Sequence, residues 1–259
     1  NIGQLKVPDK IVIASHSSQH CLDFIDSATH GVDILVEKPL FYDFSDFHSL
    51  NSEFQSRVFF NLEFYNAFFL QDFRQMVQII PLEKISIIWL DPLGEERKDE
   101  AEKFSEIYSS IFNDQLLHVL SICKALNLDV RNVKNLSVDS KSPNNLNGID
   151  ITYDLDDIAV TVSLSRFADK RERRIVLNSG VAELDFTTKP YVYQQGQFIK
   201  ELTSSERMYP ISHTLNNFLN QPEGIGTSQL SLKALMPEVE LAFKCEALFI
   251  KNILDSIDV

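Results

Sequence analysis

The chain has 259 residues, of which 44% are hydrophobic and 24% are charged, a balance typical of a globular protein with a substantial buried core. Its 24 basic residues are outnumbered by 37 acidic ones, and the formal charge of −13 argues against nucleic acids and anionic membranes as partners. No apolar run is long enough to span a bilayer, and three widely separated cysteines suggest neither a disulfide framework nor a zinc site, so we expect a cytoplasmic protein without a metal.

The first 36 residues have the pattern of a strand–helix–strand unit. Residues 9–15 contain a short β-branched run typical of a buried strand, and residues 19–30 place apolar side chains at helical spacing. Residues 33–36 (DILV) predict a second buried strand. Short connections of this kind favour a parallel, right-handed βαβ unit. The α/β pattern continues with helices predicted at 43–54 and 66–80 and strands at 57–62 and 82–90.

The second part of the chain changes to antiparallel patterns. Residues 91–110 are charged and poor in apolar side chains, which predicts an exposed loop or a frayed helix, whereas residues 113–126 predict an apolar helix. Hairpin spacing around Asn178-Ser179-Gly180 and around Gly196 indicates a mainly antiparallel sheet. Its strands are predicted at 130–139, 149–155, 158–167, 173–177, 182–186, 191–194 and 197–202.

Closing helices are predicted at 212–219 and 237–256, the second with Pro237 at its first helical position. The expected fold is therefore α/β plus α+β: a partial Rossmann-type parallel sheet, then a domain with a large, mostly antiparallel, open-faced sheet and flanking helices. We place the first domain at residues 1–56 and the second at 57–259, with the closing helices packing back on the first domain.

Two segments carry a resemblance to a known family. The first combines IVIASHSSQH (11–20) with GVDILVEKPL (31–40), in which a strand, a small-residue loop, a histidine, a helix and a second strand lead to Glu37-Lys38-Pro39. The second is NDQLLHVL (113–120), where Asp114 and His118 lie one turn apart on one helix face. Together they resemble the glucose–fructose oxidoreductase, inositol dehydrogenase and rhizopine-catabolism family (Gfo/Idh/MocA), and the likeness covers nearly the whole chain.

The resemblance implies an oxidoreductase that transfers a hydride between NAD or NADP and a hydroxyl of a sugar, sugar derivative or nucleotide sugar. Lys38 would orient the hydroxyl and stabilise a developing alkoxide, and His118 would act as acid or base beside Asp114. A homo-oligomer formed through the second-domain sheet is also implied. The cofactor-binding residues carried over are Ser15, His16, Ser17, His20, Glu37, Lys38 and Pro39.

The sequence departs from the family pattern at its start. The family's glycine-rich phosphate loop is absent, and by resemblance roughly 60 residues of the Rossmann half are missing, so we expect a chain lacking the N-terminal part of that domain. The alternative is a non-catalytic relative acting as a binding or scaffold protein. Each candidate also has a plain structural interpretation: Lys38 as a solvated lysine, Asp114 as a helix cap, His118 as a satisfied buried histidine, and His20 as a first-turn helix residue.

Overall fold

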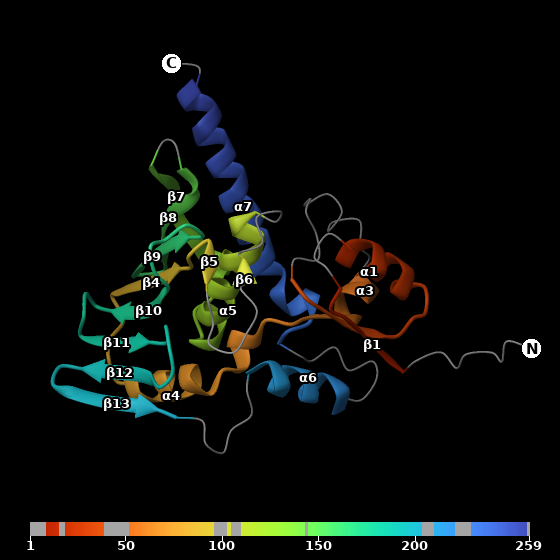
Figure 1. Ribbon diagram of the computed structural model, residues 1–259, viewed down its shortest axis with the longest axis horizontal. Helices are drawn as coiled ribbons and strands as arrows, with labels where there is room; N and C mark the ends of the chain where they lie inside the picture. Colours follow the sequence, from red (N-terminus) through yellow and green to blue (C-terminus); the bar gives the residue numbers. More distant parts are fainter. Residues whose placement is uncertain are drawn as a thin grey trace, which may run out of the picture.

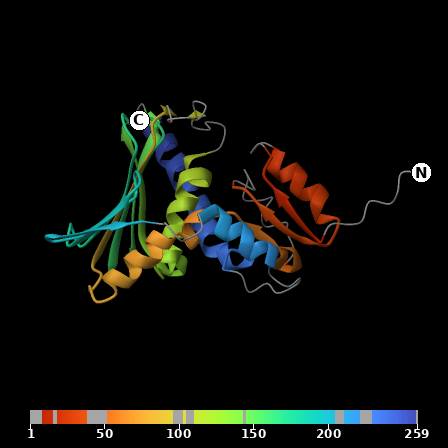
Figure 2. The ribbon, with the colours of Figure 1, turned by 60° about the horizontal axis from the view of Figure 1, so that its bottom comes forward.

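The computed structural model describes residues 9–15, 19–38, 52–95, 103–104, 110–142, 145–203, 210–220 and 229–257. It contains a small parallel sheet and a large, mostly antiparallel sheet (Figure 1). A second view shows helices filling the space between the two sheets (Figure 2). Most of the buried apolar side chains form one continuous core that includes residues from both sheets.

The small sheet confirms the predicted strand–helix–strand unit. Strands β1 (Lys10–Ile13), β2 (Asp33–Val36) and β3 (Val58–Phe60) pair in parallel, in the order β1-β2-β3. Helix α1 (His20–Ala28) connects the first two strands, and α3 (Ser52–Arg57) precedes the third. The domain boundary after residue 56 stays a prediction, but the parallel sheet itself continues to Phe60.

The large sheet has the strand order β13-β12-β11-β10-β4-β9-β8-β7. Its strands are β4 (Lys84–Leu90), β7 (Val133–Ser142), β8 (Asn145–Leu155), β9 (Ile158–Ser165), β10 (Glu172–Leu177), β11 (Ala182–Asp185), β12 (Tyr191–Gln195) and β13 (Phe198–Leu202). β4 and β9 run parallel, whereas the other neighbours are antiparallel. Both predicted hairpins form, and Asn178, Ser179 and Gly196 adopt the positive φ angles that their turns need.

One face of this sheet packs against helices. On β4 the side chains of Ile85, Ile87 and Trp89 are at most 2% exposed and alternate with half-buried ones, as expected for a strand with one covered face. The helices are η2 (Glu63–Asn66), α4 (Phe68–Val77), the π-helical turn η3 (Phe112–Leu116), α5 (Leu117–Ala125), the short η4 (Val130–Asn132) and α7 (Leu232–Ile257). Helix α6 (Pro210–Asn220) packs on the small sheet instead, where Phe218 contacts Phe59 with ring centroids 5.5 Å apart.

The prediction for the last helix was wrong at its start. Helix α7 begins at Leu232, and Pro237 lies inside it. Ser231 accounts for the early start, because its hydroxyl accepts a hydrogen bond from the Ala234 N–H (3.2 Å) and so caps the first turn. Ser231 also forms a backbone bridge to Phe59, which attaches this helix start to the small sheet.

Two other predictions meet the structure only in part. Within the charged segment 91–110, β5 (Gly94–Glu95) pairs with β6 (Lys103–Phe104), so a loop or frayed helix was wrong for these residues. The helix predicted at 43–54 falls mostly outside the described residues. Its described part, residues 52–54, overlaps α3. In the part of the chain that the structure describes, no helix has both the length and the apolar character needed to cross a membrane.

Candidate active site

The carboxyl ends of β1 and β2 lie next to each other at one edge of the small sheet. Ile13 is paired with Val36, and the Glu37 N–H donates a hydrogen bond to the Ile13 carbonyl (3.0 Å). Ser15 and Lys38 therefore follow two adjacent parallel strands at equivalent positions. This edge is where ligands bind in doubly wound α/β folds.

The predicted cofactor-binding side chains at this edge make contacts within the protein. The Ser15 hydroxyl donates to Asp23, and the His20 imidazole, 2% exposed, has its Nε2 2.7 Å from the Ser15 carbonyl oxygen. Glu37 accepts a hydrogen bond from the Asn61 amide. These contacts fix the Ser15, His20 and Glu37 side chains, and the assignment of these residues to cofactor binding stays a prediction. His16, Ser17 and Pro39 lie outside the described residues.

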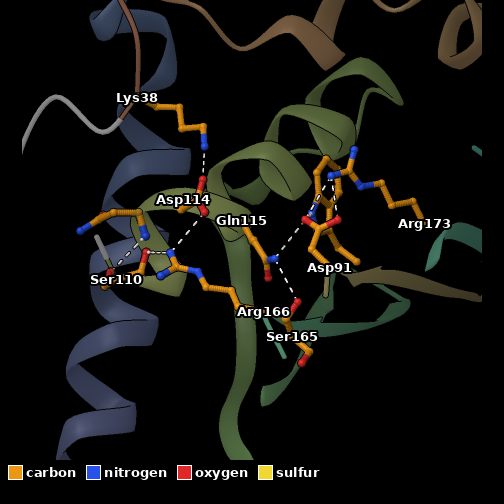
Figure 3. A network of polar contacts seen from close by, with 10 residues as sticks. Lys38, Asp91, Ser110, Asp114, Gln115, Ser165, Arg166 and Arg173 are labelled. Atoms are coloured by element: carbon orange, nitrogen blue, oxygen red, sulfur yellow. Dashed lines mark hydrogen bonds and ion pairs between the residues drawn. The ribbon is translucent and has the colours of Figure 1, made fainter. Parts of the chain in front are cut away.

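Lys38, just after strand β2, meets Asp114 on the helical turn η3 (Figure 3). The Lys38 amine donates to Oδ1 of Asp114, while Arg166 donates from Nη2 to Oδ2 of the same carboxylate (3.2 Å) and to the Ser110 carbonyl (2.8 Å). The Arg166 side chain is 4% exposed, whereas Lys38 and Asp114 are 19% and 20% exposed. One carboxylate thus joins two cations, with the lysine on the more accessible side.

Asp114 sits in the π-helical turn η3, directly before α5. Such wide turns within helices occur frequently at functional sites, because they change the direction of a side chain without ending the helix. Ser110 fixes the start of this turn: its hydroxyl accepts from the Asn113 N–H (3.2 Å) and its carbonyl from the Asp114 N–H (3.1 Å).

His118 has a different set of neighbours from Asp114, although both lie on the predicted helix. Its half-buried imidazole stacks on Trp89 (centroids 5.2 Å apart, planes 10° apart) and forms a T-shaped pair with Phe64 (centroids 5.2 Å apart). Ser121, at the next turn of the same helix, is fully buried, and its hydroxyl donates to the His118 carbonyl (2.7 Å). The described side-chain contacts of His118 are therefore aromatic, whereas those of Asp114 are ionic.

A second carboxylate lies behind His118, and the sequence analysis missed it. Asp91 accepts hydrogen bonds from Trp89 Nε1 (2.8 Å), Gln115 Nε2 (3.2 Å) and Arg173 Nη2 (2.9 and 3.0 Å). Arg171 forms an ion pair with it, its Nε 3.3 Å away. Burial lowers the pKa of Arg173, and the charge of Asp91 opposes that shift.

The sequence analysis also missed Arg166, although Asp91 and Arg166 share a weak sequence signal. Asp91 follows β4 and Arg166 follows β9, so each is a charged residue directly after an apolar strand. Among the described residues, no group of three or more His, Cys, Asp or Glu side chains is arranged to hold a metal ion.

Comparison with known proteins gives a likeness of fold. No family model and no curated protein sequence matches the chain. A dehydrogenase from Chromobacterium violaceum is similar over 98% of this chain and 80% of its own, with a TM-score of 0.73 and 12% identity. The UDP-N-acetylglucosamine 3-dehydrogenase GnnA from Acidithiobacillus ferrooxidans is similar over 95% and 80%, with a TM-score of 0.69 and 13% identity. The WlbA (WbpB) dehydrogenase from Thermus thermophilus, in complex with NAD and UDP-GlcNAcA, is similar over 90% and 70%, with a TM-score of 0.61 and 14% identity. The likeness confirms the predicted fold class.

Proposed function

We propose that this protein is a nicotinamide-dependent oxidoreductase that transfers a hydride between NAD or NADP and a hydroxyl of a sugar, sugar derivative or nucleotide sugar. The observation that carries the proposal is the ion pair between Lys38, at the carboxyl end of a parallel strand, and Asp114, one helical turn before His118. The similar structures support it, because they include dehydrogenases, one of them with NAD and a nucleotide sugar bound.

The chemistry of the site follows from these three side chains. Oxidation of an alcohol needs a group that removes the hydroxyl proton and a charge that stabilises the alkoxide character that develops. The Lys38 ammonium, partly exposed and held by Asp114, supplies that charge. The His118 imidazole is suited to accept the proton near neutral pH. Arg166 keeps the Asp114 carboxylate in place, so that Lys38 is oriented before substrate binds.

The edge of the small sheet fits the nicotinamide end of a cofactor, which supplies or accepts the hydride when bound. Ser15, Glu37 and Lys38 follow adjacent strand ends there, and Ser15 and Glu37 are fixed by Asp23 and Asn61. With His16, Ser17, His20 and Pro39, they make up the residues that we propose bind the cofactor. We further propose a homo-oligomer that associates through the large sheet, acting in the cytoplasm on a small sugar-like substrate.

The test combines cofactor binding with turnover. We expect the purified protein to bind NAD or NADP by calorimetry and to change absorbance at 340 nm with a panel of sugars and nucleotide sugars. Lys38→Met should lower kcat by about 100-fold or more while dinucleotide binding persists, because it removes a charge that acts on the developing alkoxide. Lys84→Met, which removes an exposed lysine of β4, is the matched control and should leave kcat unchanged.

Two results would refute this function. Absence of binding to both dinucleotides would favour the alternative of a non-catalytic binding or scaffold protein with the same fold. Full turnover by the Lys38→Met protein would show that hydride transfer does not depend on the lysine–aspartate pair.

A further inference from the structure

His118 is the one candidate catalytic side chain whose described contacts are aromatic. Its imidazole lies nearly parallel to the Trp89 indole, with 10° between the planes and 5.2 Å between the centroids, and Phe64 forms a T-shaped pair with each ring. Trp89 is 2% exposed, and aromatic pairs of this geometry restrict the rotation of both rings. The orientation of the imidazole in the site therefore depends on where Trp89 is held.

Trp89 is itself held by two charged groups. Arg173 is its cross-strand partner in the β4–β10 pairing, and the Arg173 guanidinium carbon lies over the indole ring, 4.1 Å from its centroid. Asp91, which directly follows β4, accepts the indole N–H (2.8 Å). The same carboxylate binds Arg173, so tryptophan, arginine and aspartate form a closed triangle.

We infer that Trp89 is a positioning residue, which fixes the plane of the His118 imidazole and brings the charges of Asp91 and Arg173 close enough to influence its protonation. The inference deepens the proposed function and rests on it, because Trp89 acts through His118, the residue proposed to accept the hydroxyl proton. The contacts place the Arg173 guanidinium within about 10 Å of the imidazole, a distance at which a unit charge in a protein interior still acts strongly.

Other charged groups surround this stack and remain constant in the test. Asp114 lies one turn earlier on the same helix, in contact with Lys38 and Arg166. Glu63 precedes Phe64 on η2, and Arg171 forms an ion pair with Asp91. Only the charges of Asp91 and Arg173 are to be removed.

The experiment uses the fact that Trp89 is the only tryptophan of the chain. A protonated imidazole stacked on an indole quenches its fluorescence, so Trp89 emission reports the protonation of His118 directly. Between pH 5 and 8 we expect the emission of the purified protein to fall along one sigmoidal transition as the pH is lowered. His118→Gln should abolish that transition.

Two charge variants give opposite expected shifts. Arg173→Met removes a positive charge near the imidazole. Because this removal favours the protonated ring, it should raise the midpoint by about half to one pH unit. Asp91→Asn removes a negative charge and should lower it. Arg173→Lys keeps the charge and should restore most of the midpoint. Arg174→Met is the matched control: it lies next on the same strand but pairs with Glu172 and Glu183, and it should leave the midpoint unchanged.

The outcomes separate this inference from the proposed function. An emission that does not change between pH 5 and 8, or changes equally in His118→Gln, would overturn the stack. Trp89 would have a packing role only if the midpoints moved in the same direction for Arg173→Met and Asp91→Asn. The same would follow if Arg173→Lys did not bring the midpoint back towards that of the wild type. If Asp91→Asn does not fold, the two Arg173 variants still decide. Because the titration needs neither cofactor nor substrate, failure to bind a dinucleotide would refute the function and leave this result standing.

Discussion

Removing the Arg166 guanidinium tests the charged centre of the site through folding stability. The side chain is 4% exposed and binds Asp114 and the Ser110 carbonyl, so Arg166→Met leaves a partly buried carboxylate with Lys38 as its remaining described cation. Loss of one partner from a fully buried pair costs roughly 3–5 kcal/mol. Because Asp114 is 20% exposed, we expect about 2–3 kcal/mol, which corresponds to a Tm lower by about 5–10 °C for a chain of this size.

Thermal unfolding followed by circular dichroism measures this loss. The double variant Arg166→Met/Asp114→Asn should lose less stability than the sum of the losses of the two single variants. We expect a coupling free energy of about 1–2 kcal/mol, because both substitutions remove the same interaction. Arg131→Met is the matched control, because its ion pair with Asp129 is at the surface, and its Tm should stay unchanged. An Arg166→Met protein that unfolds within about 1 °C of the wild type, or strict additivity in the double variant, would refute the reasoning.

Three further predictions concern other parts of the molecule. Burial raises the pKa of the Cys123 and Cys245 thiols to about 12, above the value of about 8.5 in the unfolded chain. The free energy of unfolding, measured by urea titration, should therefore decline from about pH 9 upward, because the unfolded chain loses these protons first. Both thiols should also resist a disulfide reagent at pH 8 in the folded protein. Burial also raises the pKa of Glu246, so its charged form disfavours folding. Glu246→Gln should therefore raise Tm at pH 7, and this gain should disappear near pH 4, where the carboxyl of the unfolded chain is protonated. Equal Tm values for the two proteins at pH 7 would contradict this. Ser179 has a φ of 57°, so Ser179→Gly should stabilise the protein by about 0.5–1 kcal/mol in urea unfolding, and a loss of stability would show that the turn does not carry this strain.

Local patterns predicted most elements of the fold. Hydrophobic alternation and turn residues located the strands of the large sheet, because one face of each packs against helices and the hairpins need residues that tolerate positive φ. The parallel pairing of β4 with β9 was beyond this reach, since nothing local in residues 84–90 specifies a partner at 158–165. The start of α7 was missed for a related reason: a proline suits a first helical turn, but Ser231 caps the helix earlier and is held by contact with Phe59.

The candidate site was predictable only where residues act through sequence spacing. Lys38, Asp114 and His118 stood out because they lie at a strand end and on one helix face. Arg166, Asp91 and the stacked Trp89 did not, because their roles arise from strand pairing that brings distant segments together. The π-helical turn at Asp114 has the same residue pattern as an α-helix, so spacing alone did not distinguish it.

The place of β4 in the large sheet has a consequence for biosynthesis. This strand is made early, yet both of its neighbours, β9 and β10, come from residues 158–177, which leave the ribosome much later. Until then the nascent chain carries Ile85, Ile87 and Trp89 without the strands that flank them in the finished sheet. Folding of such long-range pairings is slow, and unpaired apolar strands aggregate readily, so the interval between residues 90 and 177 is when this chain most needs protection by chaperones.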